Sequence, residues 1–150
     1  MRLIYIRSIS ALLLFLVQYS ALAYLLLSGP LYPGPWYAWV FYLAGWLLGL
    51  WSLAVMGPGN LNAAPDVLPE GHLVTRGPYR VIRHPMYAAI LLVLIPLVGS
   101  DPSIIRISVL ILLLLNLLLK IRYEEQKLRN KFLHYKEYSS GTWRLLPPVY

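Results

Sequence analysis

One polar stretch interrupts an otherwise apolar chain, between Gly71 and Tyr87, with the sequence GHLVTRGPYRVIRHPMY. It contains three arginines, two histidines, two tyrosines and two prolines, and the segments on both sides of it are hydrophobic. A second polar group comes later, the carboxylate pair Glu124 and Glu125. Polar groups held against lipid are costly and usually mark a functional site. We therefore expect the cations of the first stretch and the carboxylates of the second to form one composite site.

Opposite charges on the two sides of a pocket suit a small zwitterionic or multiply charged cofactor. The sequence has neither GxGxxG nor GxxxxGK[ST], so a Rossmann dinucleotide site and a P-loop are unsupported. It has no cysteine, which excludes disulfides, thiolate metal sites and cysteine nucleophiles. His72 and His84 have no ligand-like spacing with a third residue, so we predict no metal site.

The composition predicts an integral membrane protein. Of 150 residues, 59% are hydrophobic and 13% are charged, whereas soluble proteins carry about 25% charged residues. The formal net charge is +7, but the cations flank apolar blocks. Lipid headgroups and membrane orientation explain such cations more simply than nucleic acid. We expect one domain over residues 1–150, with two membrane helices in 1–56 and a cofactor-binding core in 57–150.

The elements that must position the site are predicted to be about four transmembrane helices, so the fold class is an all-α integral membrane protein. The first two cover residues 3–27 and 36–56, each long enough for the roughly 20 residues that a span needs. The third covers 85–98, about 21 Å at the usual helical rise, so it is tilted or begins below the surface. The fourth covers 104–119 and is nearly pure leucine and isoleucine.

Residues 120–138 are predicted to form an amphipathic helix that continues the fourth span out of the membrane. Its apolar stripe recurs at helical spacing and consists of Ile121, Glu124, Leu128, Phe132 and Tyr135. Glu124 therefore points towards the segment that carries His84. Glu125 is rotated about 100° further, and we expect it to pair with Arg129 in water.

The distribution of cations predicts which side the site faces. Arginine and lysine gather near the N-terminus, in the 57–84 loop and after the fourth span, with Arg106 as the exception. The positive-inside rule then places both termini and the 57–84 loop in the cytoplasm. The polar stretch and the carboxylate pair thus share the cytoplasmic face.

Each of these side chains also has a purely structural explanation. The three arginines can serve as topology anchors, and His84 before Pro85 can be a helix cap. Glu124 and Glu125 can form a solvated helix face with neighbouring lysines and arginines.

The run LVTRGPYRVIRHPMY, from Leu73 to Tyr87, resembles a signature of the isoprenylcysteine carboxyl methyltransferase family, which is related to phospholipid methyltransferases. A second signature of that family is a Glu-Glu pair followed by leucine, phenylalanine and spaced tyrosines. Here it reads EEQKLRNKFLHYKEY from Glu124 to Tyr138, followed by RLLP. The two signatures occur in the family's order and cover about the C-terminal half of the chain.

The resemblance implies a membrane-embedded methyltransferase that uses S-adenosyl-L-methionine. It places the cofactor contacts on ten residues: Gly71, His72, Leu73, Val74, Tyr79, His84, Pro85, Met86, Tyr87 and Glu124. The candidate catalytic residues are Lys120, Arg122, Glu125 and Arg83. Lys120 stands where the family has a substrate-side arginine, so it keeps the charge but lacks the bidentate fork. Arg122 is the alternative cation for that role.

The methyl acceptor stays open at this point. A carboxylate acceptor needs no general base, whereas an amine or hydroxyl acceptor needs one, for which Glu125, His84 and the tyrosines are available. We expect a lipophilic substrate that enters from the bilayer, such as a prenylated thiol compound, a phospholipid amine, an isoprenoid acid or a quinone-like lipid. The alternatives are an NADPH-dependent membrane reductase, which shares an Arg-His-Pro-x-Tyr segment, and a non-catalytic scaffold or transport component.

Overall fold

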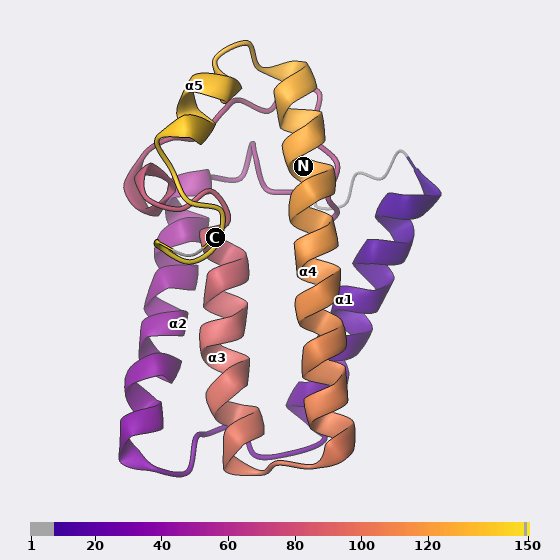
Figure 1. Cartoon of the computed structure of the whole chain (residues 1–150), viewed down its shortest axis with the longest axis vertical. Helices are drawn as coiled ribbons and strands as arrows, with labels where there is room; N and C mark the ends of the chain where they lie inside the picture. Colours follow the sequence, from indigo (N-terminus) through magenta and orange to yellow (C-terminus); the bar gives the residue numbers. More distant parts are fainter. Residues whose placement is uncertain (1–7, 149) are drawn as a thin grey trace.

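The computed structural model describes residues 8–148 and 150, and its regular structure is helical (Figure 1). Within those residues there is no β-strand, and one isolated β-bridge joins Ile82 to Trp143. The predicted all-helical fold class is therefore confirmed. The helices are α1 (Ile9–Leu27), α2 (Trp36–Met56), the 3₁₀-helix η1 (Gly77–Arg80), α3 (Pro85–Ser100), α4 (Ile104–Lys131) and α5 (Tyr135–Ser140).

Among the residues that the structure describes, three helices are long and apolar enough to cross a membrane: α1 with 19 residues, α2 with 21 and α4 with 28. Helix α3 is apolar but has 16 residues, about 24 Å of helix against a hydrocarbon core of about 30 Å. A fourth complete span thus stays a prediction. The predicted bounds of α2 are confirmed, whereas the predicted start of the first helix at residue 3 lies outside the described residues.

The helices pack as two pairs, α1 along α4 and α2 along α3 (Figure 1). Leucines from three helices join the pairs in one core, with Leu25 of α1, Leu94 and Leu97 of α3 and Leu117 of α4 almost completely buried. Because lipid is as apolar as leucine, these side chains stabilise the arrangement through close van der Waals packing, which sets how α3 sits against α1 and α4.

Gly45 permits the close approach of α2 to α3. A Cβ atom at this position would lie 2.8 Å from Cγ2 of Val93 and 3.0 Å from the carbonyl oxygen of Ala89. Because one of these atoms belongs to the backbone of α3, a side chain here would push the two helices apart.

The predicted amphipathic helix over 120–138 is wrong in its second half. Helix α4 ends at Lys131, Phe132 is extended, and the short helix α5 begins at Tyr135. The break turns the chain back towards the bundle, so that Tyr135 is completely buried while Leu133 is left exposed. An unbroken helix would have carried Tyr135 away from the core.

Two irregular segments meet at one end of the bundle (Figure 1). They are the 57–84 connection between α2 and α3 and the chain after α4, and they lie opposite the short turns at 28–35 and 101–103. The polar stretch and the carboxylate pair are therefore at the same end, as the sequence predicted.

Candidate active site

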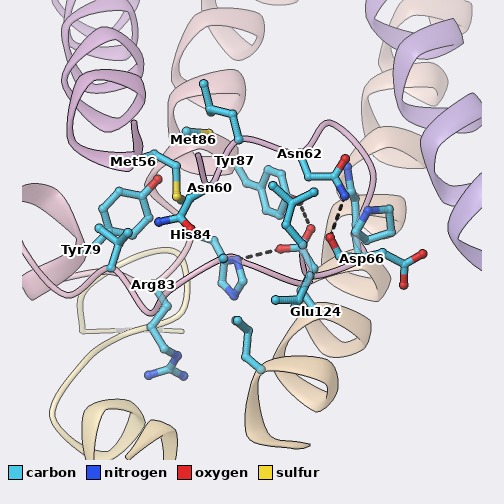
Figure 2. A pocket seen from close by; sticks show the side chains of 18 of the residues that line it. Met56, Asn60, Asn62, Asp66, Tyr79, Arg83, His84, Met86, Tyr87 and Glu124 are labelled. Carbon is cyan, nitrogen blue, oxygen red and sulfur yellow. Dashed lines mark hydrogen bonds and ion pairs between the residues drawn. The ribbon is translucent and has the colours of Figure 1, made fainter. Parts of the chain in front are cut away.

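A cavity of about 480 Å³ lies between the 57–84 connection and the outer half of α4 (Figure 2). Small-molecule sites in proteins typically enclose about 300–1,000 Å³. Side chains from α1, α2, α3, α4 and α5 also reach it. The cavity is therefore large enough for a cofactor and is bounded by every helix of the bundle.

The 57–84 connection is held in place over the cavity by polar contacts. Asn60 closes it on itself, since its Oδ1 accepts from the backbone N–H of His72 at 2.8 Å and its Nδ2 lies 3.0 Å from Nε2 of the same histidine. Lys131, at the end of α4, donates to the carbonyl oxygens of Leu68, of Pro69 at 2.9 Å and of Gly71 at 2.9 Å. The 57–84 connection is thus attached to α4 through three of its backbone carbonyls.

His84 stands at the start of α3, because Pro85 fixes the first helical residue and His84 becomes the N-cap. Its buried imidazole stacks on the ring of Tyr87, with 5.6 Å between ring centroids and 1° between planes. Nδ1 lies 3.4 Å from Oε2 of Glu124, and Nε2 lies 3.8 Å from Oε1 of Glu125. Burial lowers the pKa of His84, but the two carboxylates outweigh burial and raise that pKa above its usual value. The site therefore favours the charged imidazolium.

Glu124 faces the cavity, and the prediction that it points towards His84 is confirmed (Figure 2). Its Oε1 accepts a hydrogen bond from the hydroxyl of Tyr87, and its Oε2 is the partner of His84. The side chain is 19% exposed, so it is anchored by α3 while one side of the carboxylate stays open to a ligand.

Glu125 is not where the sequence placed it. The contact with Arg129 exists, at 3.7 Å, but the expectation that Glu125 lies in water is wrong, because the residue is 3% exposed. Its Oε1 accepts from Nε of Arg83 at 2.8 Å and its Oε2 from Nε of Arg144 at 3.0 Å. The chain after α4 folds back over this face of the helix and encloses the carboxylate. Glu125 is not among the residues that line the cavity.

The two candidate substrate-side cations have different surroundings. Lys120 lines the cavity, is 1% exposed, and donates to Oε1 of Gln18 at 2.6 Å and to the carbonyl oxygen of Ala63 at 3.0 Å. Its Nζ also lies 5.3 Å from the ring centroid of Tyr87. Arg122 is exposed on the other face of α4 and does not line the cavity. Of the two, the structure brings only Lys120 to the cavity.

Three tyrosines from η1 and α5 add buried hydroxyls. Those of Tyr79 and Tyr135 are buried and have no hydrogen-bond partner among residues 8–148 and 150, while Tyr138 donates to the carbonyl oxygen of Tyr79 at 2.7 Å. Burial raises the pKa of all three, that of Tyr138 to about 12. They therefore keep their protons at physiological pH, and two of them can still bind a ligand.

The structure brings all ten predicted cofactor-binding residues to the cavity wall. Of the predicted catalytic residues, Lys120 and Arg83 join them, and Glu125 and Arg122 do not. Sequence reasoning did not identify three other parts of the cavity wall. They are Gln18 and Tyr19 of α1, residues 60–68 of the 57–84 connection, and Tyr135 and Tyr138 of α5. The polar Gln18 within an apolar helix was the one signal that pointed to this part of the site.

Known proteins provide an independent comparison. No curated protein matches the chain significantly. The model of the isoprenylcysteine carboxyl methyltransferase family matches residues 38–130, which include nearly all of α2, the 57–84 connection with η1, the whole of α3 and nearly all of α4. Because this match spans more than half of the chain and contains all of the first signature and the start of the second, including Glu124 and Glu125, the chain belongs to the isoprenylcysteine carboxyl methyltransferase family.

Proposed function

We propose that this protein transfers a methyl group from S-adenosylmethionine to a lipophilic acceptor held at the membrane. The family implies methyltransferase activity on a lipid-modified substrate. The observation that carries the proposal is the cavity, whose wall contains all ten residues that the family signatures nominate for the cofactor.

The groups on the cavity wall fit this cofactor chemically. The open side of Glu124 suits the cofactor's ammonium group or its ribose hydroxyls, because a carboxylate accepts strong hydrogen bonds from such donors. The unpartnered hydroxyls of Tyr79 and Tyr135 offer two donors for the cofactor's oxygen or nitrogen atoms. The tyrosine rings also provide π-faces for a sulfonium cation.

When bound, S-adenosylmethionine supplies an electrophilic methyl group whose transfer leaves a neutral thioether. The protein's task is then to hold the acceptor in line and to exclude water. Residues 60–72 of the 57–84 connection, which lie over the cavity, and the buried side chains of α3 and α4 in its wall provide that exclusion. Glu125 does not reach the cavity, and of the groups weighed as a general base only His84 and the tyrosines line it. The raised pKa of His84 and of the buried tyrosines keeps these groups protonated, so the site best suits an acceptor that needs no base, such as a carboxylate.

Lys120 marks the acceptor side of the cavity. Its buried ammonium lies between α1 and the 57–84 connection, with Gln18 and Ala63 as neutral hydrogen-bond partners. Tyr19 of α1, Leu53 of α2 and Ile90 of α3 also line the cavity, and all three belong to apolar helices, of which α1 and α2 are long enough to cross a membrane. We infer that a lipophilic acceptor enters from the bilayer between these helices and presents its polar group to Lys120.

Calorimetry on the purified protein in detergent tests the proposal. We expect S-adenosylmethionine to bind with a dissociation constant in the micromolar range, roughly 7–8 kcal/mol of free energy. Its demethylated product should compete for the same site. Binding of NADPH, with no binding of S-adenosylmethionine or of its demethylated product, would instead support a reductase and refute the proposal.

We also propose that both termini and the cavity face the cytoplasm. Arginine and lysine concentrate in the 57–84 connection and after the apolar part of α4, at the end of the bundle where the cavity lies. Reporter fusions to the two ends should therefore both give cytoplasmic signals. A C-terminal reporter that reads outside would place the cavity on the other face of the membrane.

A further inference from the structure

The chain after α5 runs beside the segment that leads into α3. We call residues 141–146 the C-terminal strap. Its Trp143 forms a parallel bridge with Ile82 and donates from its N–H to the carbonyl oxygen of Val81 at 3.0 Å. In return, the N–H groups of Arg83 and His84 donate to the strap carbonyls of Trp143 at 2.7 Å and Arg144 at 3.0 Å. The backbone at His84 is therefore held by the strap directly.

The side chain of Arg83 adds a second set of contacts to the same region. Its Nη1 donates to the carbonyl oxygen of Ser139 at 2.8 Å, to Oγ1 of Thr142 at 3.1 Å and to the carbonyl oxygen of Thr142. Its Nε donates to Glu125. The side chain is 8% exposed, so water does not replace these partners. Arg83 thus ties the α3 entry segment to both the strap and α4.

Glu125 connects the strap to His84 from behind the cavity. One carboxylate oxygen is bound to Arg83 and the other to Arg144 of the strap. The first of these oxygens also lies 3.8 Å from Nε2 of His84, an atom with no hydrogen bond to any residue that the structure describes. The other imidazole nitrogen meets Glu124, which lines the cavity. His84 is therefore held between one carboxylate inside the site and one outside it.

We propose that Glu125 and the C-terminal strap position His84 in the cavity, so that residues which never touch the cofactor set the affinity for it. The inference rests on the proposed function for the identity of the cofactor. The strap lies beyond residue 130, where the family match ends. Its residues 144–146 belong to the RLLP run of the second signature, but none of them is among the ten residues that the resemblance places at the cofactor. Arg144 is the link to test, because its side chain is 35% exposed and its replacement leaves the buried pair of Arg83 and Glu125 intact.

The test compares Arg144→Gln with Arg129→Gln. Both changes remove a cation from the same oxygen of Glu125, but Arg129 belongs to α4 and is a more distant and more exposed partner. We expect Arg144→Gln to raise the dissociation constant for S-adenosylmethionine about 3- to 10-fold, as the loss of a half-exposed charge-assisted hydrogen bond does. Arg144→Lys should restore most of the affinity, and Arg129→Gln should change it less than about 2-fold.

Two measurements separate positioning from general stability. Affinities for S-adenosylmethionine are measured well below each variant's thermal unfolding midpoint. If the affinity lost in Arg144→Gln returns on further cooling, the strap only stabilises the fold and the proposal fails. Equal losses in Arg144→Gln and Arg129→Gln would also overturn the proposal, because only the first variant loosens the strap.

Nitrogen NMR of the histidine rings gives a readout that needs no cofactor. The chain has three histidines, so single substitutions of His72 and His134 assign the signals of His84. Arg144→Gln should shift those signals, and Arg129→Gln should leave them nearly unchanged. If the wild-type protein binds no S-adenosylmethionine, the proposed function fails, and the NMR comparison still decides whether the strap positions His84.

Discussion

Replacement of Glu124 with glutamine is expected to weaken S-adenosylmethionine binding by roughly 10- to 150-fold, because a hydrogen bond to a charged group contributes about 1.5–3 kcal/mol. The carboxylate accepts from Tyr87 on one oxygen and faces His84 with the other. Glutamine removes the negative charge and turns an NH₂ donor towards one of these two donors. The substitution therefore changes the carboxylate proposed to bind the cofactor, and it also changes that side chain's contacts with Tyr87 and His84.

A matched control for this change is Glu137→Gln. Glu137 belongs to α5, its side chain is 86% exposed, and it does not line the cavity. Calorimetry on both variants in the same detergent should show near wild-type affinity for Glu137→Gln and the large loss for Glu124→Gln. An unchanged affinity in a folded Glu124→Gln protein would remove this residue from the cofactor site.

The local part of the site could be predicted from the sequence. Residues 71–87 form a compact motif, and the helical phase of α4 correctly turns Glu124 towards that motif. Pro85 sets the start of α3 and leaves His84 as its cap, which the sequence also indicated. These features depend on backbone preferences and on spacing within one element, and such information is contained in a short stretch of sequence.

The parts that could not be predicted depend on contacts between distant segments. Gln18 and Lys120 are 102 residues apart, and no spacing rule connects them. The buried state of Glu125 has the same origin, because Arg83 and Arg144, whose side chains enclose its carboxylate, lie 42 and 19 residues away from it along the chain. A helical wheel treats that face as solvated, since it represents one helix and omits the chain that packs on it.

Glu125→Gln is expected to destabilise the fold by about 3–5 kcal/mol, the usual cost of removing one partner from a buried ion pair. The pair with Arg83 is buried on both sides, with the two side chains 8% and 4% exposed. The substitution leaves the guanidinium of Arg83 enclosed without its counter-charge. The free energy of unfolding in detergent measures the effect, and Glu137→Gln again provides the exposed control.

The uncompensated charge explains most of this expected cost, and a double variant tests that explanation. Arg83→Met, added to Glu125→Gln, removes the stranded cation, so the double variant should lose less stability than the two single changes added together. Arg83 also donates to Ser139 and Thr142, so recovery will be incomplete. A cost below about 1 kcal/mol for Glu125→Gln alone would match an exposed pair. That result would place Glu125 in water and remove the link between the strap and His84.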